Sequence, residues 1–396
     1  MTTDLESIYD ELNSSLESMD SLMRTSYVLE SLIDLYEIHS TNTNVSQEHV
    51  RTAKLALEMA VAGSSYESRH LVPGSENWID SVSLEDLENS IKNNISKIGA
   101  QFNQSIQGYF SNFTFLLTFF DTHESKLRKL SESLRSSGVR RKSFSMKGER
   151  YLLHNEEPVK SIDDYVKVFK SDMDILTNVL VRCLEYQDKN TLQATKTLFK
   201  AFSSKKYKEL FEDRVSFIDD IIRLAKMKKP QRRIMYNTLG DEYVSDFLLG
   251  MWYIYARKHD VYKEDDVAEY KEKEGYFSLI ISKATNIDKN VLDKSVDFDN
   301  ITERQLLNLI DASLTAVQEY KQAFKFVSKL SHLGKINFVN DFIAGGALSL
   351  PIYRIFISNY RMVLYMSLMV MTTTTSAFYA AKGNVKFVEK LVNKAL

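Results

Sequence analysis

The residue types that carry most enzyme and metal chemistry are present in this chain, but not at the spacings that such chemistry requires. The sequence contains no GxGxxG or GxxxxGK[ST] phosphate loop, no HExxH zinc motif and no GxSxG nucleophile motif. Its seven histidines do not pair at metal-ligand spacings. Two Asp-x-Asp pairs, Asp172/Asp174 and Asp297/Asp299, offer carboxylates but lack an accompanying phosphate loop. We therefore predict a protein that is not an enzyme and that holds no metal and no cofactor.

Basic side chains gather in two short segments whose chemistry suits phosphate. The denser segment, KMKKPQRR, contains Lys226, Lys228, Lys229, Arg232 and Arg233. The other contains Arg135, Arg140, Arg141 and Lys142. Contacts of lysine and arginine with phosphates supply sequence-independent affinity for nucleic acid. The denser segment is our candidate nucleic-acid-binding site, and an ordinary solvated basic face is the alternative interpretation.

The composition favours long helices. The chain has 396 residues, of which only 13 are glycine and 4 are proline. Its single cysteine, Cys183, excludes an intrachain disulfide and is expected to be a small core residue. The twenty uncharged residues between Arg361 and Lys382 are long enough to span a bilayer, but Thr372–Thr375 make their second half weakly hydrophobic. We predict a buried core helix there and no membrane partner.

The strongest helical pattern in the chain lies near residues 83–138. Apolar residues recur there every three or four positions without a proline, which predicts one continuous or once-bent helix over 84–135 that ends at Gly138. A break near Gly99, Gly108 or Asp121 is the alternative. Phe113, Leu116 and Phe120 are its predicted core residues. The fold class we predict is α+β and predominantly α-helical, with an elongated body, this long central helix and a small antiparallel β element.

Five segments follow from the pattern of apolar residues and turns. They are an acidic helical leader (1–82), the long central helix (83–137), a hairpin plus a helical segment (138–232), a small antiparallel sheet region (233–300) and a C-terminal helical segment (301–396). We predict the hairpin to turn at Lys147-Gly148 and a helix to begin at Ser161. We predict strands in RIMYN, FLLGMWYIYAR and YFSLIIS. Gly383 is predicted to divide two final helices, about 353–381 and 384–395.

The leader differs in charge from the remainder of the chain. Residues 1–40 hold nine acids and one base, which gives −8 against +6 for all later residues. One hypothesis is that the residues before about 85 are separable from the body, with the Pro73-Gly74 turn as an exposed connection. The alternative is that apolar leader residues pack permanently against the long helix. Those residues are Leu16, Met19, Leu32 and Leu35.

The order of these segments resembles the internal head proteins of giant tailed bacteriophages. A helical leader and a Pro-Gly loop precede SLEDLENSIKNNISKI, and a long helix with an aromatic middle ends in SKLRKLSESLRSSG. KGERYLLHNEEPVKSIDDYVKVFKSDMDIL follows, then LLGMWYIYAR, and the chain closes with SAFYAAKGNVKFVEKLVNKAL. The resemblance implies a structural protein of the virion, packaged inside the capsid after synthesis in the host cytoplasm. It also implies other head proteins and packaged DNA as partners, and ejection with the genome.

The resemblance further implies processing sites, because such phages cut head proteins after small-x-Glu sequences. The residues that match are Glu17, Glu48, Glu58, Glu67, Glu76 and Glu85. Beyond residue 85 only Gly240-Asp241-Glu242 matches. The richness of the leader in serine and glutamate is the alternative explanation of these matches. Two other functions also stay open: a host-directed effector or enzyme delivered with phage DNA, and a cytoplasmic scaffold that binds partners through the long helix.

Overall fold

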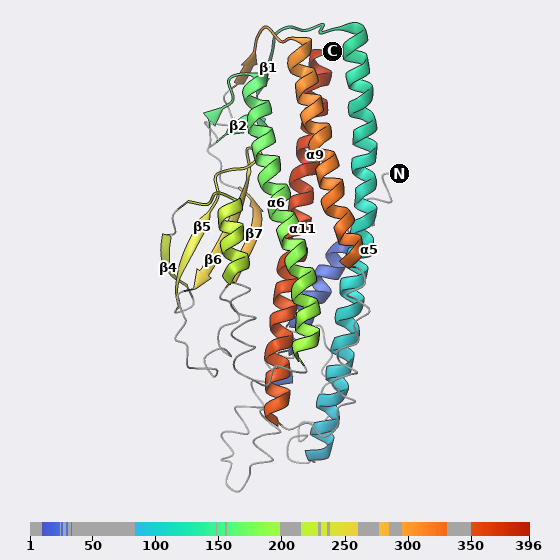
Figure 1. The fold of residues 1–396 in the computed structure, drawn as a ribbon, viewed down its shortest axis with the longest axis vertical. Helices are drawn as coiled ribbons and strands as arrows, with labels where there is room; N and C mark the ends of the chain where they lie inside the picture. The colour runs from blue at the N-terminus through green and yellow to red at the C-terminus, as the bar shows by residue number, and fades with distance from the viewer. Residues whose placement is uncertain are drawn as a thin grey trace.

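The fold is a bundle of long helices with a small sheet at its side, as seen in a computed structural model (Figure 1). The structure describes residues 10–23, 25–26, 29–30, 33, 84–147, 149–154, 157–198, 215–228, 231–235, 238–259, 277–284, 295–330 and 350–396. The helices are 10–23 in the leader, α5 (Leu84–Ser137), α6 (Ile162–Leu198), 215–224, α9 (Glu303–Leu330) and α11 (Leu350–Ala395). The predicted α+β class with predominant helix is confirmed.

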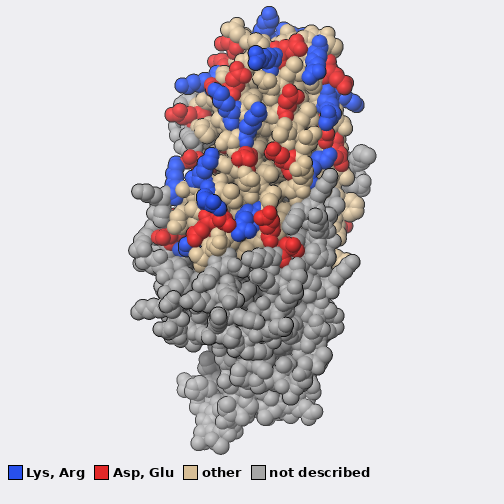
Figure 2. Space-filling view, viewed as in Figure 1, with Lys and Arg blue, Asp and Glu red and all other residues tan. Residues whose placement is uncertain are grey.

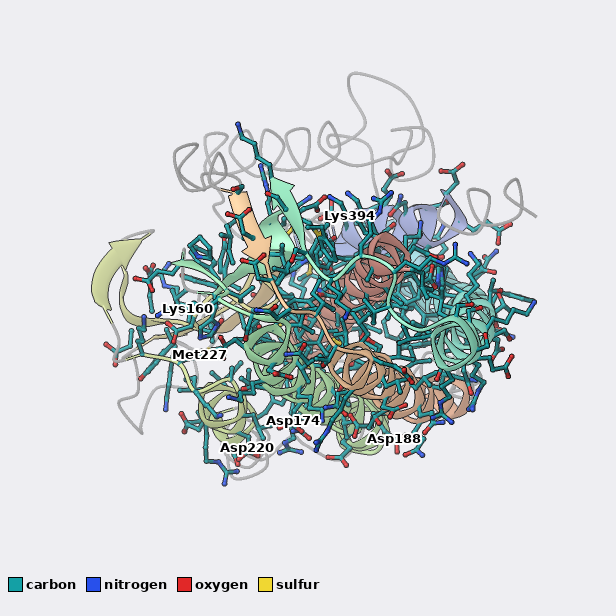
Figure 3. The ribbon with its side chains drawn as sticks, turned by 90° about the horizontal axis from the view of Figure 1, so that it is seen from above. Lys160, Asp174, Asp188, Asp220, Met227 and Lys394 are labelled. Atoms are coloured by element: carbon teal, nitrogen blue, oxygen red, sulfur yellow. The ribbon has the colours of Figure 1, made fainter. Side chains whose placement is uncertain are left out.

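The four long helices lie side by side along the long axis of the molecule. α5 and α11 run towards the same end, and α6 and α9 run in the opposite direction (Figure 1). α9 packs between α5 and α6, while α11 contacts all three of these helices and strand β7 (Phe277–Lys283). Looking down the bundle, the other helices and the sheet are arranged around α11 (Figure 3). α11 is therefore the central element of the fold.

The predicted long helix is confirmed as a single element, α5. Its residues Phe113, Leu116 and Phe120 are fully buried, as the apolar spacing predicts. The helix ends at Gly138, which has φ of +68° and donates its N–H to the oxygen of Leu134 at 2.8 Å. Glycine adopts this left-handed conformation without the steric cost of a β-carbon, so the predicted stop is also confirmed.

Hydrogen bonds at their first turns explain where α6 and α9 begin. Ser161 accepts a hydrogen bond from the backbone N–H of Asp164 at 3.1 Å, which makes Ser161 the N-cap of α6. Before α9, Thr302 accepts from the N–H of Gln305 at 3.3 Å, and the Gln305 side chain accepts from the N–H of Thr302 at 3.0 Å. This reciprocal pair is a capping box, so both helix starts follow from local sequence.

The prediction that Gly383 divides the last helix is wrong, because α11 continues through this residue to Ala395. Tyr151 packs so closely that a β-carbon at position 383 would lie 2.3 Å from its hydroxyl oxygen. The ring of Tyr151 also stacks on Phe387, one turn further along α11, with ring centroids 5.1 Å apart. Glycine is therefore present as a contact surface for Tyr151 and not as a helix stop.

The predicted hairpin around Lys147-Gly148 is also wrong. β1 (Phe144–Lys147) pairs antiparallel with β8 (Ser295–Phe298), in a register that sets Phe144 opposite Phe298. A 3-10 helix, Arg150–Leu152 (η1), follows β1 and leads into β2 (Leu153–His154), which pairs with β3 (Glu157–Pro158). The rings of Phe144 and Phe298 lie 5.6 Å apart, so an aromatic cross-strand pair joins segments that are distant in sequence.

The predicted small antiparallel sheet is present, with the strand order β4-β5-β6-β7. The additional strands are β4 (Gln231–Met235), β5 (Thr238–Val244) and β6 (Trp252–His259). β5 was not among the predicted strands, and only the second part of FLLGMWYIYAR is β6. Leu249 and Gly250 have φ of +52° and +74°, so the residues before Trp252 form a turn. Ile254 and Ala256 of β6 face the helices and belong to the same core as the bundle.

The uncharged stretch of α11 lies in this core, as predicted. Thr373 and Thr374 are fully buried, and Thr375 accepts or donates a hydrogen bond with the hydroxyl of Tyr109 of α5 at 2.7 Å. None of the helices in the described part of the chain is apolar over a length sufficient to cross a membrane. Cys183 is fully buried, and burial raises the pKa of its thiol to about 12, which agrees with a core role.

Two neighbouring positions of α5 provide a direct test of the core. Leu116→Asp buries a charge without a partner, so we expect it to lower the free energy of unfolding by more than about 4 kcal/mol. Phe115 is 56% exposed, and Phe115→Asp should cost about 1 kcal/mol or less. Urea denaturation followed by circular dichroism measures both. Equal stability of the two variants would contradict this placement of α5.

The contact between Gly383 and Tyr151 predicts a change of sign in a double-mutant cycle. Gly383→Ala should destabilise the protein by about 1–2 kcal/mol, because the new methyl group displaces Tyr151. In a Tyr151→Ala background the same substitution should stabilise it by about 1 kcal/mol, since alanine is the better helix former. Thermal denaturation of the four proteins gives the cycle. An effect of the same sign in both backgrounds would show that Tyr151 does not explain the glycine.

Candidate nucleic-acid interface

The predicted basic segment 226–233 is divided between two elements. Lys226 is exposed at the end of helix 215–224, in a turn where its own φ is +49°. Lys228 follows with its side chain 74% exposed, and its backbone N–H donates to Val244 of β5. Arg232 and Arg233 belong to β4, the edge strand of the sheet, while Lys229 lies outside the described residues. The five basic residues thus do not form one continuous helical face.

Acidic residues adjoin this segment. Lys228 forms an ion pair with Asp246, which lies between β5 and β6. The register of β4 and β5 sets Arg232 opposite Asp241 and Gln231 opposite Glu242. An ion pair reduces the potential available to a bound anion. At Lys228 the segment is therefore more nearly neutral in the fold than in the sequence.

One of the carboxylates near this segment is buried. Asp172 of α6 is 3% exposed and accepts a hydrogen bond from the backbone N–H of Leu249 at 2.7 Å. Burial raises the pKa of Asp172 to about 7, since the charged form loses its hydration; Asp246 adds to the rise, while the Leu249 N–H and Lys226 oppose it. Asp172 thus joins α6 to the turn before β6, and its charge depends on pH in the neutral range.

The second basic segment lies at the end of the bundle where α5 and α11 terminate. Arg135 occupies the last turn of α5, and Arg140, Arg141 and Lys142 are exposed in the connection to β1. The backbone N–H groups of Arg140 and Arg141 donate to the oxygen of Ala395, at 3.2 and 3.0 Å. The connection therefore crosses the end of α11.

The other residues with chemical potential do not assemble into a site. Asp172 is buried, whereas Asp174 is exposed and accepts from Asn178 at 3.0 Å, because positions two apart on a helix face different directions. Asp297 and Asp299 are both exposed near the end of β8. Within the residues that the structure describes, no three His, Cys, Asp or Glu side chains are grouped to hold a metal ion.

The predicted processing sites fall either in helices or outside the described residues. Glu17 is exposed in the leader helix, and Glu85 lies in the first turn of α5. Glu48, Glu58, Glu67 and Glu76 lie outside the described residues, as does the Pro73-Gly74 turn. Proteases prefer exposed, irregular backbone, so cleavage after Glu17 or Glu85 requires local unwinding of a helix.

The described part of the leader packs against the long helices. Leu12, Met19 and Leu22 are buried in the main core, and Ser18 hydrogen-bonds Ser105 of α5 at 2.7 Å. Leu16 packs partly buried against the same core, while Leu32 and Leu35 lie outside the described residues. These contacts support the interpretation in which the leader is a permanent part of the body.

A buried arginine joins the leader to α11 as well. Arg361 is only 3% exposed, and its guanidinium donates to the side-chain oxygen of Ser26 at 2.9 Å and to the Ser26 carbonyl at 3.1 Å. The same group forms an ion pair with Glu30 at 2.6 Å. Removal of the leader would leave this buried cation without these partners, which is costly in a protein interior. One of the leader's acids, Glu30, thus neutralises a buried cation of α11.

The chain was compared with family models, curated proteins and solved structures. No family model, curated protein or solved structure matches it. The phage resemblance therefore stays a prediction that rests on the order of sequence segments.

The raised pKa of Asp172 predicts a pH-dependent effect of Asp172→Asn. The fold favours the neutral acid, so this side chain's contribution to stability is fully present below pH 4 and is lost as pH rises to about 7. Asparagine cannot ionise and can still accept from Leu249. We expect the variant to gain stability relative to the wild type between pH 4 and pH 8, by no more than about 4 kcal/mol.

Chemical denaturation at several pH values measures this difference. Asp174→Asn is the matched control, because Asp174 is exposed two residues away on the same helix. A pH-dependent difference of the same size in this control would show that the burial of Asp172 is not the cause. An Asp172→Asn effect that is independent of pH would contradict the assignment.

Proposed function

We propose that this chain is a non-enzymatic structural protein packaged inside a phage capsid, an internal head protein. In this role its partners are other head proteins and the packaged DNA, which it contacts without sequence specificity, and it leaves the capsid with the genome. The observation that supports the proposal most is the order of its sequence segments, from the helical leader to the closing SAFYAAKGNVKFVEKLVNKAL.

The arrangement of apolar surface is consistent with a structural role. The long helices turn their apolar faces towards one shared core that also includes the leader and the sheet. Among the described residues, the large hydrophobic side chains that are exposed are Phe115, Val244, Ile280 and Tyr379. These are scattered over α5, the sheet and α11, and singly exposed apolar residues are ordinary for a soluble surface.

The buried stripe of α5 bears on the scaffold alternative. A scaffold that bound partners through the apolar stripe of α5 would need Phe113, Leu116 and Phe120 at its surface. All three are fully buried against the neighbouring helices. Such binding would require the bundle to open, so the contacts of α5 count against a scaffold that binds through this stripe.

Mass spectrometry of purified virions tests the proposal. We expect peptides of this chain in intact virions of the phage that encodes it, and their depletion from particles that have ejected their DNA. A major capsid protein quantified in the same samples is the control, because it stays in the emptied particle. Absence of the chain from intact virions would refute the proposal, and equal amounts in full and emptied particles would refute ejection.

The same peptides report on the leader. Since Ser18, Ser26 and Glu30 bond to α5 and α11, we expect virion-derived protein to retain peptides from residues 10–33. Semi-tryptic peptides that begin after Glu17 or Glu85 would instead show processing at those sites.

A further inference from the structure

We infer that the end of the bundle where α5 and α11 terminate binds the phosphate backbone of double-stranded DNA through five side chains, here called the basic end. These are Arg135, Arg140, Arg141, Lys142 and Lys147. The inference deepens the proposed function, and rests on it, by assigning the DNA contact to a surface other than segment 226–233.

The basic end is formed by one short stretch of chain without acidic residues. Between Glu132 and Glu149 the sequence contains these five basic residues and no aspartate or glutamate. All five are exposed. Segment 226–233 has the same number of basic residues, but Lys228 is paired with Asp246 and Arg232 lies opposite Asp241. We therefore expect an anion to be attracted more strongly to the basic end than to segment 226–233.

Backbone hydrogen bonds fix this stretch to the body at several points. Arg140 and Arg141 donate to Ala395 of α11, and the carbonyl of Lys142 accepts from the N–H of Ile301 at 2.8 Å. Lys147 lies in β1, opposite Ser295 of β8. Because these bonds use only the backbone, the five side chains stay available while their anchor points are rigid.

Several acids in the nearby helical turns have side-chain partners of their own. Glu149 pairs with Lys390, Glu389 contacts His123, and Glu124 accepts from Arg128 at 2.8 Å and from Lys321 at 3.0 Å. Among the described residues, no ion pair involves any member of the basic end. The acids that remain at the end of α5, near β8 and in the first turn of α9 are Glu132, Asp297, Asp299 and Glu303, four against the five cations of the basic end.

Figure 1 places the end of α5 and the connection to β1 at one extremity of the molecule. In Figure 2, lysine and arginine side chains project from the upper end of the described surface, with acidic side chains between and below them. Figure 3 labels Lys394 near the end of α11, where its amine donates to Ser145 of β1 at 2.6 Å and lies 5.5 Å from the Phe144 ring centroid. Lys394 thus holds β1 in place and is not counted in the basic end.

Duplex DNA suits this surface better than a single small anion. The five cations are spread over a helix end, a connection and a strand, and cations on three separate elements can contact several phosphates of a duplex. Three of the five are arginines, which bind phosphate oxygens with two parallel N–H groups. With three to five phosphates contacted, log affinity should fall against log salt with a slope of about −3 to −4.5.

Two charge-matched variants of the full chain test the assignment. The first replaces all five residues of the basic end with serine, and the second replaces Lys226, Lys228, Lys229, Arg232 and Arg233 with serine. Both lower the net charge by five, so a general charge effect would weaken them equally. The probe is a fluorescent duplex of about 30 base pairs in two unrelated sequences, titrated by anisotropy at about 50 to 200 mM salt.

We expect the basic-end variant to lose at least about tenfold in affinity and most of the salt slope, for both sequences. The 226–233 variant should change affinity less than about threefold. A wild-type protein that binds neither duplex, or a greater loss in the 226–233 variant, would overturn the inference. Equal losses would do so as well, since they would show that only net charge matters.

A measurement on the wild-type protein covers the case in which a variant does not fold. Formaldehyde crosslinking to the duplex, followed by peptide mapping, should place crosslinks at Lys142 or Lys147, and crosslinks confined to other lysines would refute the inference. Crosslinks of these lysines to the acidic leader of a second copy, without DNA adducts, would also refute it and indicate self-association. These results are independent of the virion measurement, so failure of DNA binding and failure of the head-protein proposal are distinguishable.

Discussion

The packing of Phe378 against α5 is the contact on which the bundle depends. Its ring makes edge-to-face contacts with Phe113, Phe119 and Phe120, at centroid distances of 5.9, 5.9 and 5.5 Å. Such pairs contribute about 0.5–1.5 kcal/mol each beyond the burial of their area. Tyr320 of α9 lies 5.9 Å from Phe120, so the cluster joins three helices. α6 and strand β7 of the sheet pack on α11 in turn, and α6 also packs on α9.

Polar contacts set the alignment of α11 within this core. The hydroxyl of Tyr109 donates to the carbonyl of Met371 at 2.6 Å, and Gln187 of α6 donates to Ser367 at 2.8 Å. Apolar packing alone tolerates a shift of one helical turn, whereas a buried hydrogen bond lost in such a shift leaves an unsatisfied group. Arg361 of α11 also fixes the position of the leader, because it bonds Ser26 and Glu30. Ser367 and Thr375 of α11 thus help to specify the register of the bundle, whereas the buried hydroxyls of Thr373 and Thr374 have no hydrogen-bond partner among the described residues.

The parts of the fold that could be predicted from the sequence are those decided by local spacing. The apolar spacing of α5 repeats at every turn of this helix. Its stop at Gly138 and the start of α6 at Ser161 each depend on residues within about one turn. The pairing of β1 with β8 could not be predicted in this way, since Phe144 and Phe298 meet only after most of the chain has folded. β5 escaped prediction because TLGDEYV contains glycine and two acids, which disfavour a strand in isolation. The prediction that Gly383 divides the last helix is wrong for a similar reason, since its partner Tyr151 is remote in sequence.

The candidate site shows the same division between local and distant information. Two segments of the sequence are comparably basic, and their charges can be counted from the sequence alone. Which of them is available to an anion depends on acids that the fold brings near, such as Asp246 beside Lys228. Near the basic end the fold has the opposite effect on the available charge. There Glu149 forms an ion pair with Lys390, and Glu124 forms one with Arg128. A cluster of available charges is therefore a property of the tertiary structure. The sequence alone does not separate the two segments, because both lie in intervals without acids, Glu132 to Glu149 and Asp220 to Asp241.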